Sequence, residues 1–359
     1  GFRVVPSAIA GHAVVEGNIS STGVIVGTGG LQFPESSVQL TASFPEHKRI
    51  VIVSLHGSAS ENGAALLSAI AEISPSVSEP YMLKIEPGVY DVGPNQIYTK
   101  EYLDIEGAGQ ALTRIKGTYP AVGARSGFFE VEGNSELRML TVENYGAGAS
   151  NYTGIEVFAG EANVRLSDIT VLVNSGTQTH TGIEIWEDGT ALRNVTVTVK
   201  GGGGTVGLVL NSSNVVVDGA NIRAVDGSYG NWGVVLTGSH RSTIMNAIIE
   251  ASGTASSETI GLDNRTGSSP GIFNSTIRAF GASNNYAIYN NGATLNGGDI
   301  EIHNSRLSGE NLSVLNESSN NAYIAVSQLK GLVSNTGIGG VKCVGAYNED
   351  FNSLNSSCS

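Results

Sequence analysis

The segment GIEIWEDGTALRNVTV, residues 182–197, contains two short patterns that recur along the chain and decide its fold. The first is a glycine followed by alternating apolar residues, as in GIEI at 182–185. The second is a small polar residue followed by the same alternation, as in NVTV at 194–197. An apolar residue at every second position is typical of a β-strand that buries one face.

Both patterns return in the same phase at intervals of 22 to 30 residues. The apolar anchors of the second pattern are Leu140, Ile169, Val195, Ile222, Ile248, Ile277, Leu307 and Leu329. The glycines of the first pattern are Gly154, Gly182, Gly207, Gly233 and Gly261. Two patterns that keep one period indicate stacked coils, each of which buries its inward side chains against its neighbours.

The repeat excludes other solenoids. Leucine-rich repeats require a leucine consensus that this chain lacks, and helical repeats require an apolar period of 3.6 residues. We therefore predict an all-β chain that folds as a parallel β-helix, with nine or ten coils between residues 81 and 340 and the anchors inside. Asparagines at the coil corners are expected to adopt left-handed turns or to form a side-chain ladder: Asn194, Asn221, Asn246, Asn274 and Asn304.

Outside the repeat, the sequence predicts a helix and an N-terminal arm. Residues 62–73 carry an apolar stripe with Asn62 as the expected N-cap and Pro75 as the stop. This helix would cap the open N-terminal end of the solenoid, where strand edges are bare. Residues 1–45 show short strand-like runs between glycines and are predicted to form a β-rich arm. Residues 46–340 then form the β-helix, and residues 341–359 form a tail.

Cys343 and Cys358 are the only cysteines, and both lie in this tail. A disulfide that closes the tail is favoured over two free thiols in a reducing compartment. Such a bond indicates a secreted protein, extracellular or at the cell surface.

Charge and composition narrow the range of partners. The net charge is −13 and no cluster of lysine or arginine stands out, so we predict no nucleic-acid partner. The longest apolar stretch, residues 64–73, is about half of the ~20 residues that span a bilayer, so we predict no membrane insertion. The histidines lack metal-ligand spacing, and we predict neither a metal nor a cofactor.

The runs LKIEPGVY at 83–90 and LDIEGAG at 103–109 resemble the opening coils of the pectin-lyase-like superfamily. They are most similar to pectin methylesterases and to uncharacterised secreted bacterial relatives, whose tails residues 342–358 also resemble. The resemblance implies a right-handed parallel β-helix with an N-terminal capping helix. The catalytic motifs of pectin methylesterases and pectate lyases are absent. Of the polygalacturonase motifs only RIK at 114–116 occurs, without the acidic partners, and we interpret it as a coincidence. Residues 31–40 are similar to a short segment of phage tail fibres and bacterial surface proteins.

The candidate site consists of two carboxylates and two tryptophans. Glu156 and Glu184 occupy the same place in neighbouring coils, and period-two geometry points both outward, about 4.8 Å apart. A retaining glycosidase needs two carboxylates about 5 Å apart. Trp186 lies on the same face and is expected to stack on a sugar, in a groove lined by Trp186 and Trp232. The alternative, which we favour, is a solvated acidic pair beside an exposed aromatic.

The missing motifs favour a protein without catalytic activity. We predict a secreted or cell-surface structural protein, a component of a filament, matrix or fibre, that self-associates through residues 1–45. Two alternatives remain open: a polysaccharide-active enzyme (hydrolase, lyase or esterase) that uses Glu156 and Glu184, and a carbohydrate-binding module. In both, a polysaccharide is the partner.

Overall fold

The computed structural model of the chain describes residues 3–6, 13–16, 31–32, 38–39, 49–121, 127–146, 148–158, 163–254, 256–265, 268–291 and 299–359. The chain divides into two compact units, Gly1–Glu46 and His47–Ser359. The small unit holds two antiparallel strand pairs. One joins β1 (Arg3–Pro6) to β2 (Ala13–Glu16), and the other joins β3 (Leu31–Gln32) to β4 (Val38–Gln39). The rest of the predicted arm lies outside the described residues.

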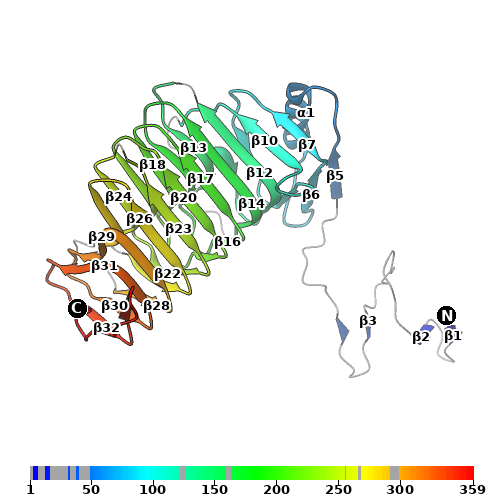
Figure 1. Ribbon diagram of the computed structural model, residues 1–359. Helices are drawn as coiled ribbons and strands as arrows, with labels where there is room; N and C mark the ends of the chain where they lie inside the picture. Colours follow the sequence, from blue (N-terminus) through cyan, green and yellow to red (C-terminus); the bar gives the residue numbers. More distant parts are fainter. Residues whose placement is uncertain are drawn as a thin grey trace. The chain divides into compact units, whose positions relative to one another are not determined.

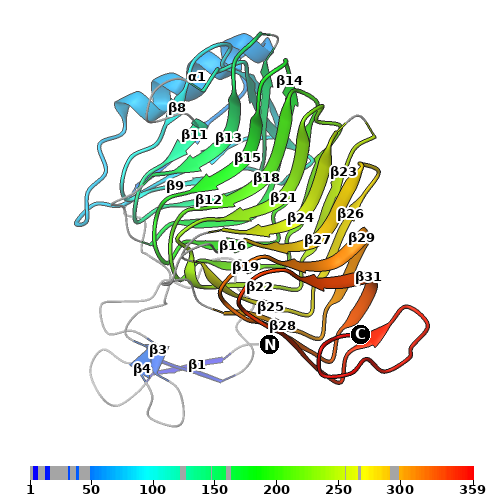
Figure 2. The same ribbon diagram turned by 90° about the vertical axis from the view of Figure 1, so that its left-hand side faces the viewer.

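The large unit is a parallel β-solenoid of about nine turns with one α-helix (Figure 1). Strands of successive turns lie side by side along the solenoid, as both ribbon views show (Figure 2). Every strand pairing between β5 and β33 is parallel. The predicted fold class, a nearly all-β chain wound as a parallel β-helix, is confirmed.

The pairings form three ladders of stacked strands. Ladder 1 contains β5 (Arg49–Val53), β6 (Tyr81–Ile85), β9 (Leu103–Glu106), the first parts of β12 (Glu136–Gly146) and β14 (Arg165–Ser175), β16 (Ala191–Arg193), β19 (Val216–Asp218), β22 (His240–Met245), β25 (Ser269–Phe273), β28 (Ile300–His303), β30 (Ala322–Ala325) and β32 (Val341–Val344).

Ladder 2 contains β7 (Gly88–Asp91), β10 (Thr113–Gly117), the last parts of β12 and β14, β17 (Thr196–Lys200), β20 (Asn221–Val225), β23 (Ile248–Ser252), β26 (Thr276–Phe280), the first parts of β29 (Arg306–Asn316) and β31 (Gln328–Asn335), and β33 (Tyr347–Asn348). Ladder 3 contains β8 (Ile97–Tyr98), β11 (Gly127–Val131), β13 (Tyr152–Val157), β15 (His180–Ile185), β18 (Gly204–Leu210), β21 (Gly230–Leu236), β24 (Glu258–Asn264), β27 (Asn284–Asn290), and the last parts of β29 and β31.

The predicted anchors fill the core with one exception. Seven of them are buried, with exposed fractions of 2% or less: Leu140, Ile169, Val195, Ile222, Ile277, Leu307 and Leu329. The prediction for Ile248 is wrong, because its side chain is 50% exposed. The neighbouring Ile249 is fully buried and stacks between Ile222 and Ile277. Two adjacent isoleucines satisfy the apolar pattern in either phase, and only the register of the stacked coils selects one.

The helix α1 (Ala59–Glu72) lies at the N-terminal end of the solenoid and packs against β7 (Figure 1). The sequence-based N-cap is wrong, because Ser58 and Glu61 form a capping box and start the helix earlier. Asn62 lies inside the first turn, where its side chain accepts a hydrogen bond from the His56 N–H (2.7 Å) and donates one to the Val89 carbonyl (3.1 Å). Asn62 thus ties the helix to the first coil.

The recurrent glycines of ladder 3 are explained by close packing. A Cβ atom added to Gly207 would lie 2.3 Å from Cγ2 of Ile222 and 2.6 Å from the Gly233 carbonyl oxygen. The same kind of contact, with a core side chain and the next backbone, occurs at Gly154, Gly182, Gly233 and Gly261. Each glycine therefore lets the backbone of one coil approach the core residue of the next.

The corner asparagines do both things that the sequence predicts. Asn194, Asn246, Asn274 and Asn304 have positive φ angles between 46° and 54°. Their side-chain amides also form a ladder, in which Asn304 donates to Asn274 (2.8 Å) and Asn194 donates to Asp168 (3.1 Å). Asn221 is an exception, because the left-handed corner of its coil is Gly219 (φ 72°).

The C-terminal tail is closed as predicted. Cys343 and Cys358 form a disulfide with their Cα atoms 5.3 Å apart. The tail folds back on the last coil, where the Cys343 N–H donates to the Ser356 carbonyl and the Leu354 N–H donates to the Ala346 carbonyl. The disulfide therefore fastens the end of the chain to the solenoid.

Candidate functional site

A column of glutamates crosses three strands of ladder 3. Glu156 in β13 pairs in register with Glu184 in β15, as the repeat predicts. Glu130 in β11 pairs with Glu156 on the other side and extends the column to three carboxylates. Sequence reasoning missed Glu130 because its strand lacks the glycine–isoleucine marker. The alternation in Phe129-Glu130-Val131 was the available signal.

The three glutamates of this column differ in how far their side chains are exposed to solvent. Glu130 is fully buried, and Glu156 is 1% exposed, whereas Glu184 is partly exposed. Each has polar contacts: Gln96 Nε2 donates to Glu130 Oε2 (2.9 Å), and the Gly127 N–H donates to Glu156 Oε2 (2.7 Å). The interpretation of Glu156 and Glu184 as a solvated pair is therefore wrong for Glu156. The side chains project away from the core but are covered by their surroundings.

The surroundings of Glu184 raise the pKa of its carboxyl to about 7. Burial is the largest cause and the charge of Glu156 adds to it, whereas a hydrogen bond with the Trp186 side chain opposes the shift. Asn211 Nδ2 also donates to Glu184 Oε1 (3.3 Å). Glu184 therefore takes up and releases its proton around neutral pH, where an ordinary carboxyl is fully ionised.

A proton donor beside an ionised carboxylate is the arrangement used in glycoside hydrolysis. The strand register places Glu156 and Glu184 one strand spacing apart, about 4.8 Å. A nucleophile must also contact the sugar, and the 1% exposure of Glu156 does not permit that contact. The pair therefore has the spacing of a retaining enzyme without the access.

The two predicted tryptophans lie on ladder 3 but are not brought together. Trp186 follows β15 directly and is 43% exposed. Trp232 pairs with Val206 and Ile260 near the start of β21. Trp186 thus lies beyond the C-terminal ends of these strands and Trp232 near their N-terminal ends. Only Trp186 is adjacent to the glutamate column.

A second polar cluster occupies the same ladder further along the solenoid. Arg265 Nε forms an ion pair with Asp263 Oδ2 (2.8 Å), and the Tyr289 hydroxyl donates to Glu317 Oε2 (2.6 Å). Burial raises the pKa of Asp263, and its Arg265 partner opposes this shift. Burial and the nearby Asp263 charge raise the pKa of Glu258. The sequence analysis did not single out any of these residues.

No protein family and no curated protein matches this sequence. Among solved structures, ORF18 of Geobacillus virus E2 matches 83% of this chain with a TM-score of 0.54 and 13% identity, and this chain spans 60% of its length. Pectate lyase Pel9A matches 85% of this chain with a TM-score of 0.50 and 14% identity, over 79% of its own length. The chain has the parallel β-helix fold of pectate lyase Pel9A.

The resemblance to the pectin-lyase-like superfamily is thus confirmed as a likeness of fold. A β-helix supports unrelated functions, so residues on its surface, and not the architecture, carry the argument about activity. Within the described part of this β-helix protein, no three His, Cys, Asp or Glu side chains gather as metal ligands. No helix among those residues is long and apolar enough to span a bilayer.

Proposed function

We propose that this protein is a secreted or cell-surface β-helix protein without catalytic activity, which assembles with copies of itself into a filament, matrix or fibre. The observation that supports the proposal is the state of the two solenoid ends. Among the described residues, β5 pairs only with β6, and the last part of β31 pairs only with β29. Apolar side chains accompany both edges, since Ile52 is 61% exposed and Leu332 is 74% exposed.

Such ends favour association through strands. An unpaired strand edge presents backbone N–H and C=O groups that a strand from another chain can satisfy. The strand pairs of residues 1–45 are short, and isolated two-stranded hairpins are marginally stable. We therefore propose that the arm pairs with a neighbouring copy. A head-to-tail contact that does not close on itself generates a filament. The disulfide supports an oxidising compartment.

The test compares the full-length protein with a variant that lacks residues 1–45. Light scattering and electron microscopy should show assemblies of the full-length protein and monomers of the variant. Circular dichroism should show that the variant retains its β-helix. A full-length protein that stays monomeric at high concentration would refute the proposal, as would a truncated protein that assembles equally well.

A second candidate function is binding or cleavage of a polysaccharide on ladder 3. The observation in its favour is the exposed Trp186 beside Glu184, whose pKa lies near 7. Acidic and neutral polysaccharides should be assayed for binding, reducing ends, unsaturated products and methanol release. Binding that is lost in Trp186→Ala would support a carbohydrate-binding module. Turnover that is lost in Glu184→Gln would support an enzyme and overturn the non-catalytic proposal.

A further inference from the structure

A shallow depression lies on the outer face of ladder 1, where β12, β14 and β16 stack. Its volume is about 280 Å³, and its lining residues are Glu136, Arg165, Ser167, Ala191 and Arg193. The strand register builds it, because Arg165 is opposite Ala191 and Ser167 is opposite Arg193. The two arginines thus occupy diagonal corners, and the small residues at the other corners leave the space between them open.

The side chains of these two arginines have no direct partner among the described residues. Neither guanidinium has an ion pair or a hydrogen bond with any of them. In the neighbouring strands, Glu136 is opposite Arg165 and Asp218 is opposite Arg193, but neither carboxylate forms an ion pair with its arginine. Asp218 accepts a hydrogen bond from Asn246 Nδ2 (2.7 Å). Two free arginines beside one depression are notable in a chain with 32 acidic and 19 basic residues.

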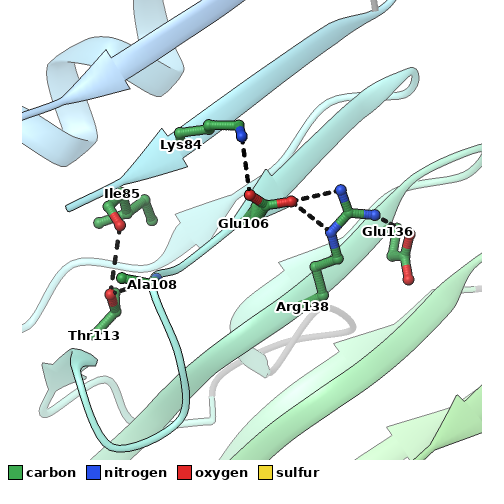
Figure 3. A network of polar contacts seen from close by, with 7 residues as sticks. All are labelled: Lys84, Ile85, Glu106, Ala108, Thr113, Glu136 and Arg138. Atoms are coloured by element: carbon green, nitrogen blue, oxygen red, sulfur yellow. Dashed lines mark hydrogen bonds and ion pairs between the residues drawn. The ribbon is translucent and has the colours of Figure 1, made fainter. Parts of the chain in front are cut away.

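The one acidic residue of the lining is already occupied. Figure 3 shows that Glu136 accepts a hydrogen bond from Arg138, whose guanidinium also binds Glu106. Glu106 in turn pairs with Lys84 (3.1 Å), so the network balances two cations with two anions. Since Arg138 compensates the charge of Glu136, the lining residues themselves leave the charges of Arg165 and Arg193 available.

We propose that Arg165 and Arg193 bind an oxyanion group of a ligand, a carboxylate, sulfate or phosphate, in this depression. Each guanidinium is planar and presents a fork of N–H donors that matches two oxygens of such a group. The Ser167 hydroxyl, at a third corner of the depression, supplies a further donor. The site lies on ladder 1, whereas Glu156 and Glu184 lie on ladder 3, so the two groups of residues are separate.

The test titrates the full-length protein by calorimetry at constant ionic strength, with chloride as the balancing anion. The probes are inorganic phosphate, inorganic sulfate and trigalacturonate, and neutral maltotriose is the control. The test variant is Arg165→Gln/Arg193→Gln. The matched control, Arg278→Gln/Lys330→Gln, removes two exposed cations of ladder 2 that do not line the depression. Circular dichroism and the Tm check that both variants fold.

At least one oxyanion probe should bind the wild type with one site per chain, while maltotriose should not bind. The affinity should fall at least tenfold in Arg165→Gln/Arg193→Gln and stay within twofold in the control variant. Binding of trigalacturonate alone would identify a saccharide carboxylate, and comparable binding of phosphate and sulfate would identify a free oxyanion. No binding in the millimolar range, or equal losses in both variants, would overturn the proposal.

Discussion

Replacing Glu184 with glutamine should stabilise the fold above neutral pH and have little effect in acid. In the folded protein, burial and the charge of Glu156 raise the pKa of Glu184 from 4.5 to about 7. The unfolded chain has the ordinary pKa. Below about pH 4.5, both states hold the proton and the carboxyl adds no penalty. Between about pH 4.5 and 7, the unfolded state releases the proton first, so stability falls as pH rises, and the full penalty is present above pH 7.

The size of the effect follows from the pKa shift. One pKa unit corresponds to about 1.4 kcal/mol, so ionisation of Glu184 destabilises the folded state by roughly 3 kcal/mol at about pH 8. Glutamine removes this penalty because it carries no charge. Its side-chain carbonyl can still accept the hydrogen bond that Asn211 Nδ2 donates to Glu184.

Urea unfolding followed by circular dichroism at about pH 4 and pH 8 would measure the effect. The free energy of unfolding of Glu184→Gln should exceed that of the wild type only at the higher pH. Glu349→Gln, at an exposed position, is the matched control and should show no such dependence. A gain of equal size at both pH values would show that packing is responsible, and a loss at pH 8 would refute the electrostatic reasoning.

Three further predictions concern the solenoid. Ile249→Ala should lower the free energy of unfolding by about 2–5 kcal/mol, whereas Ile248→Ala, one residue away but half-exposed, should change it by less than about 0.5 kcal/mol; equal effects would contradict the register. Gly207→Ala should lower the free energy of unfolding by about 1–3 kcal/mol or prevent folding, because the added Cβ would overlap the core side chain of Ile222. An unchanged Tm in thermal melting would contradict this close approach. Reduction of the Cys343–Cys358 disulfide, or replacement of both cysteines by serine, should lower the free energy of unfolding by about 3 kcal/mol in the chain-entropy model. Limited proteolysis should then cut the tail before the rest of the chain. Unchanged cleavage would show that the disulfide does not hold the tail.

The candidate site was only partly predictable. The repeat placed Glu156 and Glu184 in neighbouring strands, and the structure confirms that they are in register. The sequence repeat did not reveal that Glu130 belongs to the same column, nor that Glu156 is almost fully buried. Burial on the outer face depends on loops and side chains from other coils, which the alternation within one strand does not report. Arg165 and Arg193 escaped notice for the same reason, because 28 residues of chain separate two side chains that stacking brings into one depression.

The amino-acid sequence by itself determined the architecture of this protein: parallel coils, a helix at the N-terminal end and a disulfide-closed tail. These features follow from local chemistry, since a period of two places alternate side chains inside, and glycine is recurrent where backbones approach closely. Tertiary structure alone decided which phase of an ambiguous strand faces inward, as Ile248 and Ile249 show. It also decided that Ser58 and not Asn62 caps the helix and that the pKa of Glu184 is raised. Each of these depends on which atoms of distant coils lie beside a residue, and that is set only when the coils stack.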